Sequence, residues 1–201
     1  MLRIFSNLIL TTLLAGLFAA GLVLSRSIDP LYTLQEWLNY SRFKRYDPLI
    51  EAAGKKYQVD PMLIKAIIWR ESSFHPEKVG TKGERGLMQI TPLAANEWAK
   101  AQKIQTFKGT DLFDPKTNIE AGTWYFKQAY QRWNGKNDPI IFALAEYNAG
   151  HSNVMRWVAS TNMGPGTEAN DLKEAMKFPS TRSYVQAISD RYRFYQKRGR
   201  L

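Results

Sequence analysis

The sequence predicts a mostly α-helical protein, and three observations carry that prediction. From residue 46 onward, apolar residues recur at helical spacing, and Gly or Pro rather than alternating strand segments breaks the pattern. Several helix starts are visible because Asp or Thr stands before Pro, an arrangement typical of an N-cap. Apolar residues make up 44% and aromatic residues 13% of the 201 residues, which indicates a packed core rather than disorder.

Length and composition limit the architecture and the chemistry. The length suits one domain of about 150 residues with an N-terminal appendage. The formal net charge is +10, and residues 1–26 hold only two of the 28 basic residues, so the folded part is itself basic. This favours an acidic partner such as a wall polymer, a membrane surface or a nucleic acid. The absence of Cys excludes disulfides, thiolate zinc sites and cysteine nucleophiles.

Residues 1–26 predict an export segment. The stretch 8–24 is apolar apart from two Thr and carries no charge. Its 17 residues exceed a signal-peptide core of about 7 to 15 and reach the lower limit for a spanning helix, about 17 to 25. We expect an uncleaved inner-membrane anchor, and the alternative is a signal peptide cleaved after Ser25. Either places the remaining chain in the periplasm or elsewhere outside the cytoplasm, which argues against a nucleic-acid partner.

The elements that follow can be placed in order along the chain. Residues 27–45 form a stalk with an amphipathic run at 31–43. Residues 46–195 form the main domain, residues 151–178 its longest loop, and residues 196–201 a basic tail. Five or six helices are expected, and their signals are Asp60-Pro61 before 62–69, Thr91-Pro92 before 93–102, a Thr117/Glu120 capping box, Pro139 with Gly150, and a start near Ser180.

Glu71 is the most informative position in the main domain. Ile64, Ile67 and Ile68 precede it by seven, four and three residues, so a carboxylate continues an apolar helix face. Burial disfavours the charged form, and a raised pKa suits a general acid. The alternative is an exposed helix-end carboxylate paired with Arg70.

Two further segments can meet a ligand, although each is also consistent with ordinary structure. Residues 83–92 place two Gly, which let the backbone approach a ligand closely, and the amide of Gln89, which can donate and accept hydrogen bonds, before a capped helix. Residues 145–150 present Tyr147 and Asn148 before a glycine. Taken alone, the first is a turn and the second a helix end.

Together, these segments resemble the catalytic domain of soluble lytic transglycosylases, a family related to goose-type lysozyme. The resemblance covers about residues 46–195 and leaves the first 45 aside. One departure is Gly80, which stands where serine is common in the family. The matching motifs are ESSFHP at 71–76, GLMQITP at 86–92 and AEYNAG at 145–150.

The resemblance implies a lysozyme-like helical domain with a long cleft for peptidoglycan strands. Glu71 would protonate the bond between N-acetylmuramic acid and N-acetylglucosamine, and then help the muramic 6-hydroxyl close a 1,6-anhydro ring. Gln89 would contact the sugar beside Glu71, and Tyr147 would lie near the acid. An internal hydroxyl removes the need for the second carboxylate of ordinary glycosidases. The same resemblance adds Ser72, Met88, Asn148 and Tyr184 to the expected substrate-binding residues.

Alternative functions stay open on the sequence alone. A hydrolytic muramidase would need a second carboxylate, with Glu84, Glu146 and Asp111 as candidates. An inactive peptidoglycan-binding module predicts a damaged first motif, whereas ESSFHP is intact. No cofactor is expected, and neither His75 nor His151 has metal-ligand spacing. Recruitment by a larger cell-wall or secretion machine is compatible with a small anchored enzyme.

Overall fold

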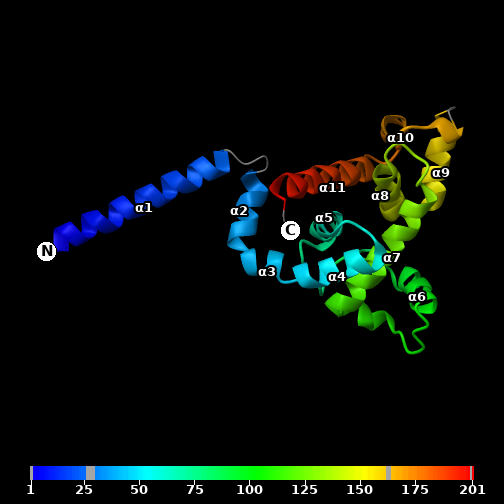
Figure 1. Cartoon of the computed structure of the whole chain (residues 1–201), viewed down its shortest axis with the longest axis horizontal. Helices are drawn as coiled ribbons and strands as arrows, with labels where there is room; N and C mark the ends of the chain where they lie inside the picture. Colours follow the sequence, from blue (N-terminus) through cyan, green and yellow to red (C-terminus); the bar gives the residue numbers. More distant parts are fainter. Residues whose placement is uncertain (1, 26–29, 162–163, 200) are drawn as a thin grey trace. The chain divides into compact units, whose positions relative to one another are not determined.

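The computed structural model describes residues 2–25, 30–161, 164–199 and 201 (Figure 1). The chain divides into two compact units, Met1–Arg45 and Tyr46–Leu201. Both are built almost entirely from helices, and the described residues contain only isolated β-bridges. The prediction of a mostly α protein is therefore confirmed.

The first unit holds three helices: α1 (Leu2–Ser25), α2 (Pro30–Leu38) and α3 (Tyr40–Lys44). Between Ile9 and Leu22, the large apolar side chains of α1 are exposed. Tyr32 and Phe43 join α2 to α3, with ring centroids 5.6 Å apart. In the part of the chain that the structure describes, no helix has the length and hydropathy that a membrane span requires.

The second unit packs its helices around α5 and α8, whose apolar residues are buried. In α5, Leu63, Ile64, Ala66, Ile67 and Ile68 are all buried, and the helix contacts α4 and α11 (Figure 1). The elements are α4 (Asp47–Tyr57), α5 (Pro61–Ser72), α6 (Pro92–Ala101), η1 (Gly109–Phe113), α7 (Pro115–Arg132), α8 (Pro139–Ala149), α9 (His151–Ser160), η2 (Gly164–Gly166), α10 (Ala169–Ala175) and α11 (Pro179–Arg198).

The two helices nearest the predicted acid begin as their sequences indicate. The Asp60 carboxylate accepts the Met62 backbone N–H at 2.8 Å and caps α5. The Thr91 hydroxyl accepts the Ala94 backbone N–H at 3.2 Å and caps α6. In both helices Pro follows the cap, where no intrahelical N–H partner is lost.

The predicted capping box of the next helix is wrong. The helix α7 begins earlier, at Pro115, because Asp114 accepts the Thr117 backbone N–H at 2.8 Å. Thr117 and Glu120 therefore lie inside the helix. An Asp before Pro is the same signal that correctly located the start of α5.

The segment 151–178 is not the long loop that the sequence predicts, because α9 and α10 occupy most of it. Gly150 has φ +84°, a conformation that favours glycine and lets the chain turn from α8 into α9. Val154, Trp157 and Val158 then form the buried face of α9. Both short helices pack against α8, so they extend the core of the unit.

Residues 78–90 form a compact loop beside α5. Two antiparallel bridges, Val79 to Arg85 and Arg85 to Ile90, hold the loop together. The buried Asn118 on α7 anchors it: its Nδ2 donates to the carbonyls of Arg85 and Leu112, each at 2.8 Å, and its Oδ1 accepts the Met88 N–H at 2.7 Å. The loop is therefore held at a fixed place relative to α7.

Candidate active site

A cavity of about 470 Å³ lies between the end of α5, the loop 78–90, α6, α7, the end of α8 and α11. Most of the residues predicted for the site line it, although they come from four different parts of the sequence. Those residues are Glu71, Gln89, Tyr147, Asn148 and Tyr184.

Glu71 stands in the last turn of α5, and its surroundings favour the protonated carboxyl. Burial raises its pKa to about 7, although the hydrogen bond from Tyr184 and the positive charges of Lys78 and Arg70 oppose the rise. The negative charge of Glu84 adds to it. A carboxyl with this pKa can donate a proton and take it back near neutral pH.

Tyr184 contacts the acid directly. Its hydroxyl donates to Glu71 Oε1 at 2.6 Å and links α11 to α5. Burial raises the pKa of Tyr184 well above its ordinary value, so the hydroxyl keeps its proton. Lys78 donates to the Glu71 backbone carbonyl, which brings a cation beside the end of α5.

Tyr147 and Asn148 form the cavity wall at the end of α8. The Tyr147 hydroxyl donates to the Met88 carbonyl at 2.9 Å and thereby ties α8 to the loop 78–90. Burial raises the pKa of Tyr147 well above its ordinary value. The Asn148 Oδ1 accepts the Thr181 hydroxyl at 2.8 Å, which links α8 to α11.

Gln89 lies in the wall with a fixed amide orientation. Its backbone has φ +48°, and its Nε2 donates to the carbonyls of Lys78 at 3.0 Å and Gly86 at 2.9 Å. A flipped amide would set its oxygen against those two carbonyl oxygens. The side-chain oxygen is therefore the group of Gln89 that can accept a hydrogen bond from a ligand.

Ser72 and Met88 require a correction, because neither side chain lines the cavity. The Ser72 hydroxyl is buried and donates to the Ile68 carbonyl at 3.2 Å, inside its own helix. The Met88 side chain is buried against α7, where a Cβ on Gly122 would clash with it. Each neighbours a cavity residue in sequence and points away from it, so the contribution of both is structural.

Sequence reasoning missed two of the charged residues at the cavity, Lys78 and Lys82, and named Arg70 and Glu84 only as alternatives. All four line the cavity. Apart from Arg70, they lie in the irregular segment after α5, where no periodicity indicates which way a side chain points. The available signal was proximity alone, since all four lie within 13 residues of Glu71.

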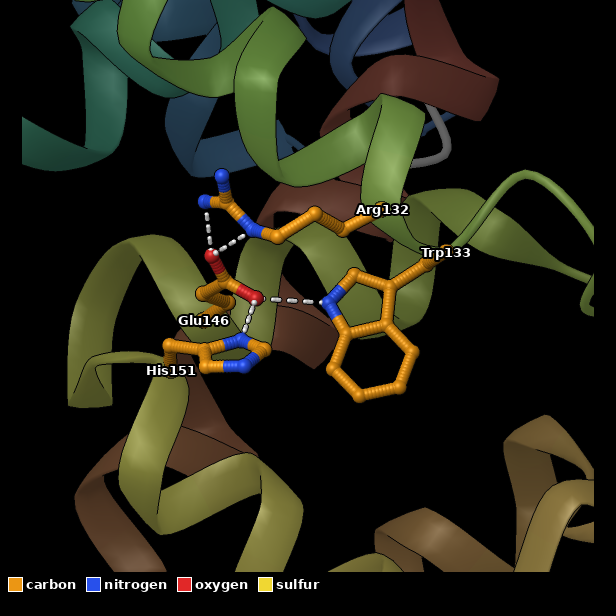
Figure 2. Close-up of polar contacts among 4 residues, drawn as sticks. All are labelled: Arg132, Trp133, Glu146 and His151. Carbon is orange, nitrogen blue, oxygen red and sulfur yellow. Dashed lines mark hydrogen bonds and ion pairs between the residues drawn. The ribbon is translucent and has the colours of Figure 1, made fainter.

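Glu146, a candidate second acid, is fully engaged elsewhere (Figure 2). The carboxylate is 2% exposed and accepts from Arg132, from the Trp133 indole at 2.7 Å and from His151 Nδ1 at 2.9 Å. Burial alone would raise its pKa, but these donors outweigh burial and lower it. Glu146 is therefore an ionised structural group, and it does not line the cavity.

Asp111 is also engaged in local structure. Its carboxylate accepts the Lys108 backbone N–H at 2.8 Å and caps η1, and it is absent from the cavity wall. Of the three candidates for a second carboxylate, only Glu84 shares the cavity with Glu71.

Known proteins match the chain over most of the second unit. A membrane-bound lytic murein transglycosylase F from Desulfosudis oleivorans is 35% identical over 150 residues, covering 72% of this chain and 31% of the relative. A soluble lytic murein transglycosylase from Salmonella typhimurium is 32% identical over 144 residues, covering 71% and 22%. The chain thus spans less than a third of the length of either relative.

Solved structures match as well. An inactive mutant of the lytic transglycosylase Slt from Pseudomonas aeruginosa, in which a Glu is replaced by Gln, superposes with a TM-score of 0.69 at 26% identity. The match covers 85% of this chain and 27% of that one. The family model described as the transglycosylase SLT domain matches residues 48–170. The helical fold, the sequence relatives and the family model agree, and the chain belongs to the transglycosylase SLT domain family.

Proposed function

We propose that the protein is a peptidoglycan lytic transglycosylase in which Glu71 is the single general acid and base. It cleaves the β-1,4 bond from N-acetylmuramic acid to N-acetylglucosamine and leaves a 1,6-anhydro ring on the muramic acid. The observation that carries the proposal is the position of Glu71, a carboxyl with a pKa of about 7 that lines a cavity within a matched family domain.

In the first step, the protonated carboxyl of Glu71 donates its proton to the glycosidic oxygen. The bond between that oxygen and C1 of the muramic acid breaks, and the N-acetylglucosamine leaves with the proton on its 4-hydroxyl. Positive charge develops at C1, and the carboxylate now beside it stabilises that charge.

In the second step, the Glu71 carboxylate removes the proton of the muramic 6-hydroxyl as its oxygen bonds to C1. The ring closes, the carboxyl regains its proton, and no water is consumed. The hydroxyl belongs to the same sugar, so its effective concentration at C1 is high. Tyr184 supports this cycle because its hydrogen bond stabilises the carboxylate formed between the two steps.

The name of the Pseudomonas aeruginosa structure describes a mutant with one Glu replaced by Gln as inactive. That finding belongs to the relative, and it supports the central role of a carboxyl in the proposed reaction. The relatives' names also specify murein, which supports peptidoglycan strands as the substrate of this chain.

A hydrolytic muramidase is the competing chemistry, and the presence of Glu84 in the cavity is the observation that favours it. Mass spectrometry of the muropeptides released from purified peptidoglycan separates the two. The proposal predicts 1,6-anhydro ends, lighter by one water than the reducing ends that hydrolysis would leave. Retained binding without any product would instead identify an inactive binding module.

We also propose that residues 1–26 direct the protein out of the cytoplasm and hold it at the inner membrane. The exposed apolar side chains of α1 support this placement, as does the membrane-bound description of one relative. The cleaved signal peptide is the alternative. Recruitment by cell-wall or secretion machinery stays a prediction.

A further inference from the structure

The loop beside Glu71 brings a second carboxylate over a glycine. The Gly80 N–H donates to the Glu84 carbonyl at 2.8 Å, and the Gly83 N–H donates to the Gly80 carbonyl at 3.1 Å, so Gly80 and Glu84 face each other across a tight turn. The Glu84 side chain folds back over this turn, and its Oε2 accepts the Lys82 N–H at 2.8 Å. A Cβ on Gly80 would clash with that same oxygen.

Gln89 also lies close to Gly80. Its Oε1 would lie 3.0 Å from the Cβ of a residue at position 80. Because both hydrogens of the Gln89 amide point at backbone carbonyls, this oxygen faces the glycine as an acceptor. Among the described residues, no donor contacts it.

Two acceptor oxygens thus lie beside Gly80 in the cavity wall. Glu84 Oε2 already accepts the Lys82 N–H, whereas Gln89 Oε1 has no donor among the described residues, and a partly buried acceptor without a donor is costly. A ligand group that donates to Gln89 Oε1 relieves this cost, and a second donor on the same ligand can bond to the Glu84 carboxylate, which has further acceptor capacity. Hydroxyl and acetamido N–H groups of an N-acetyl sugar have that chemistry, and a hydrogen bond to a carboxylate is stronger than one to a neutral acceptor.

We propose that Glu84 and Gln89 form a paired acceptor site that binds a hydroxyl or acetamido N–H of the substrate sugar, and that Gly80 lacks a side chain to admit Glu84. The inference rests on the proposed function and assigns Glu84 to binding rather than to activation of water.

The test uses the full-length protein with three variants, Glu84→Ala, Glu84→Gln and Gly80→Ser. Initial rates of muropeptide release are measured over a range of peptidoglycan concentrations, and thermal unfolding checks that each variant is folded. A lost charge-assisted hydrogen bond corresponds to about tenfold in affinity. Glu84→Ala is expected to raise KM by about tenfold with kcat nearly unchanged, and Glu84→Gln is expected to have a smaller effect.

Gly80→Ser supplies the sharper comparison. The atom nearest to a Ser Cβ would be Glu84 Oε2, at the far end of a flexible side chain, and Gln89 Oε1 would follow at 3.0 Å, so this substitution should displace Glu84 without unfolding the loop. It should therefore raise KM as Glu84→Ala does, and the double variant should be no worse than either single variant. Glu77→Gln is the matched control, because Glu77 is an exposed carboxylate of the same segment outside the cavity wall.

Unchanged KM in Glu84→Ala and Gly80→Ser would overturn the inference. So would complete loss of turnover in Glu84→Gln together with reducing-end products from the wild type, because Glu84 would then activate water. Wild-type protein that releases nothing would contradict the proposed function instead. Titration of an N-acetylglucosamine tetramer into Glu71→Gln, with and without Gly80→Ser, would then test the acceptor pair through binding alone.

Discussion

At the scale of single residues, the chemistry depends on opposing influences on one carboxyl. Burial raises the pKa of Glu71, and Tyr184, Lys78 and Arg70 limit the rise to about 7. A carboxyl with a much higher pKa would be a weak proton donor, whereas one left near its ordinary value would be ionised when the substrate arrives. The two cations and the tyrosine therefore keep the pKa of Glu71 in the range where the carboxyl can both donate and accept a proton.

Tyr184→Phe tests this balance. The hydrogen bond from Tyr184 lowers the pKa of Glu71, so its removal should raise that pKa above about 7. The acid form then persists to higher pH, and the alkaline limb of the pH–rate profile should move to higher pH. Loss of support for the carboxylate between the two steps should reduce kcat by about tenfold. An alkaline limb that stays in place or moves to lower pH would contradict this account.

Glu71 should also destabilise the fold at neutral and alkaline pH. Its folded pKa of about 7 lies above the ordinary value of 4.5. The protonated carboxyl is favoured by folding, so the protein has its full stability below pH 4.5 and loses stability as pH rises towards 7 and the carboxyl ionises. Glu71→Gln should raise the free energy of unfolding by about 3 kcal/mol at pH 8 and change it little at pH 4. Urea unfolding at the two pH values measures the difference. An equal effect of the substitution at both pH values would show that the ionisation of Glu71 does not change the stability of the fold.

Some site residues could be predicted from the sequence and others could not. Glu71 could be predicted because three isoleucines on its helix face define a buried stripe, and the structure buries all three. Ser72 and Met88 were misassigned because a motif gives order along the chain and not the direction of each side chain. Glu84 and Lys78 could not be placed, since their positions depend on bridges and turns within the loop 78–90.

At the scale of elements, the Glu146 cluster joins three helices outside the cavity wall. Arg132 and Trp133 come from the end of α7, Glu146 from α8 and His151 from the start of α9 (Figure 2). The next two residues of α8, Tyr147 and Asn148, line the cavity. The buried Glu146 carboxylate accepts hydrogen bonds from all of these donors. It therefore fixes the end of α8, which carries the cavity residues Tyr147 and Asn148.

Glu146→Gln should destabilise the protein, because an amide cannot accept from all of these donors. We expect a loss of about 2 to 4 kcal/mol in the free energy of unfolding at pH 7. Glu51→Gln, which changes an exposed carboxylate on α4, is the control and should have little effect. The pKa of Glu146 is lowered, so its contribution is present above pH 4.5 and lost on acidification. If the two variants unfold at the same urea concentration, Glu146 does not stabilise the fold through these hydrogen bonds.

The elements themselves were predictable to the extent that their ends carry chemical signals. Asp60 and Thr91 located α5 and α6, and Pro139 and Gly150 located both ends of α8. The helices α9 and α10 were missed because they are short and owe their stability to packing on α8. Their local sequence, rich in polar residues, is also typical of a loop.

At the scale of the whole molecule, the two units separate the proposed roles. Residues 1–45 form one unit and the matched domain lies within the other. Hydropathy predicted an export segment, and the motifs predicted the family, because each is a local property of the sequence. Contacts that assemble the cavity from α5, α7, α8 and α11 are long-range, and the sequence reached them only through the resemblance.

Cell fractionation tests the placement of the first unit. Full-length protein should sediment with the membrane fraction and resist a carbonate wash, whereas a version in which a cleavable periplasmic signal replaces residues 1–26 should be released with the periplasm. If expression of the full-length sequence instead yields soluble protein that begins after Ser25, the anchor is contradicted and the segment is a cleaved signal peptide.

The central claim is that Glu71 alone completes the reaction without water. The most direct measurement is digestion of purified peptidoglycan in water enriched in heavy oxygen, with wild-type protein and with Glu71→Gln, followed by mass spectrometry of the products. The account predicts unlabelled 1,6-anhydro-N-acetylmuramic ends from the wild type and no products from the variant. Reducing ends that carry the heavy oxygen, or products from Glu71→Gln, would contradict it.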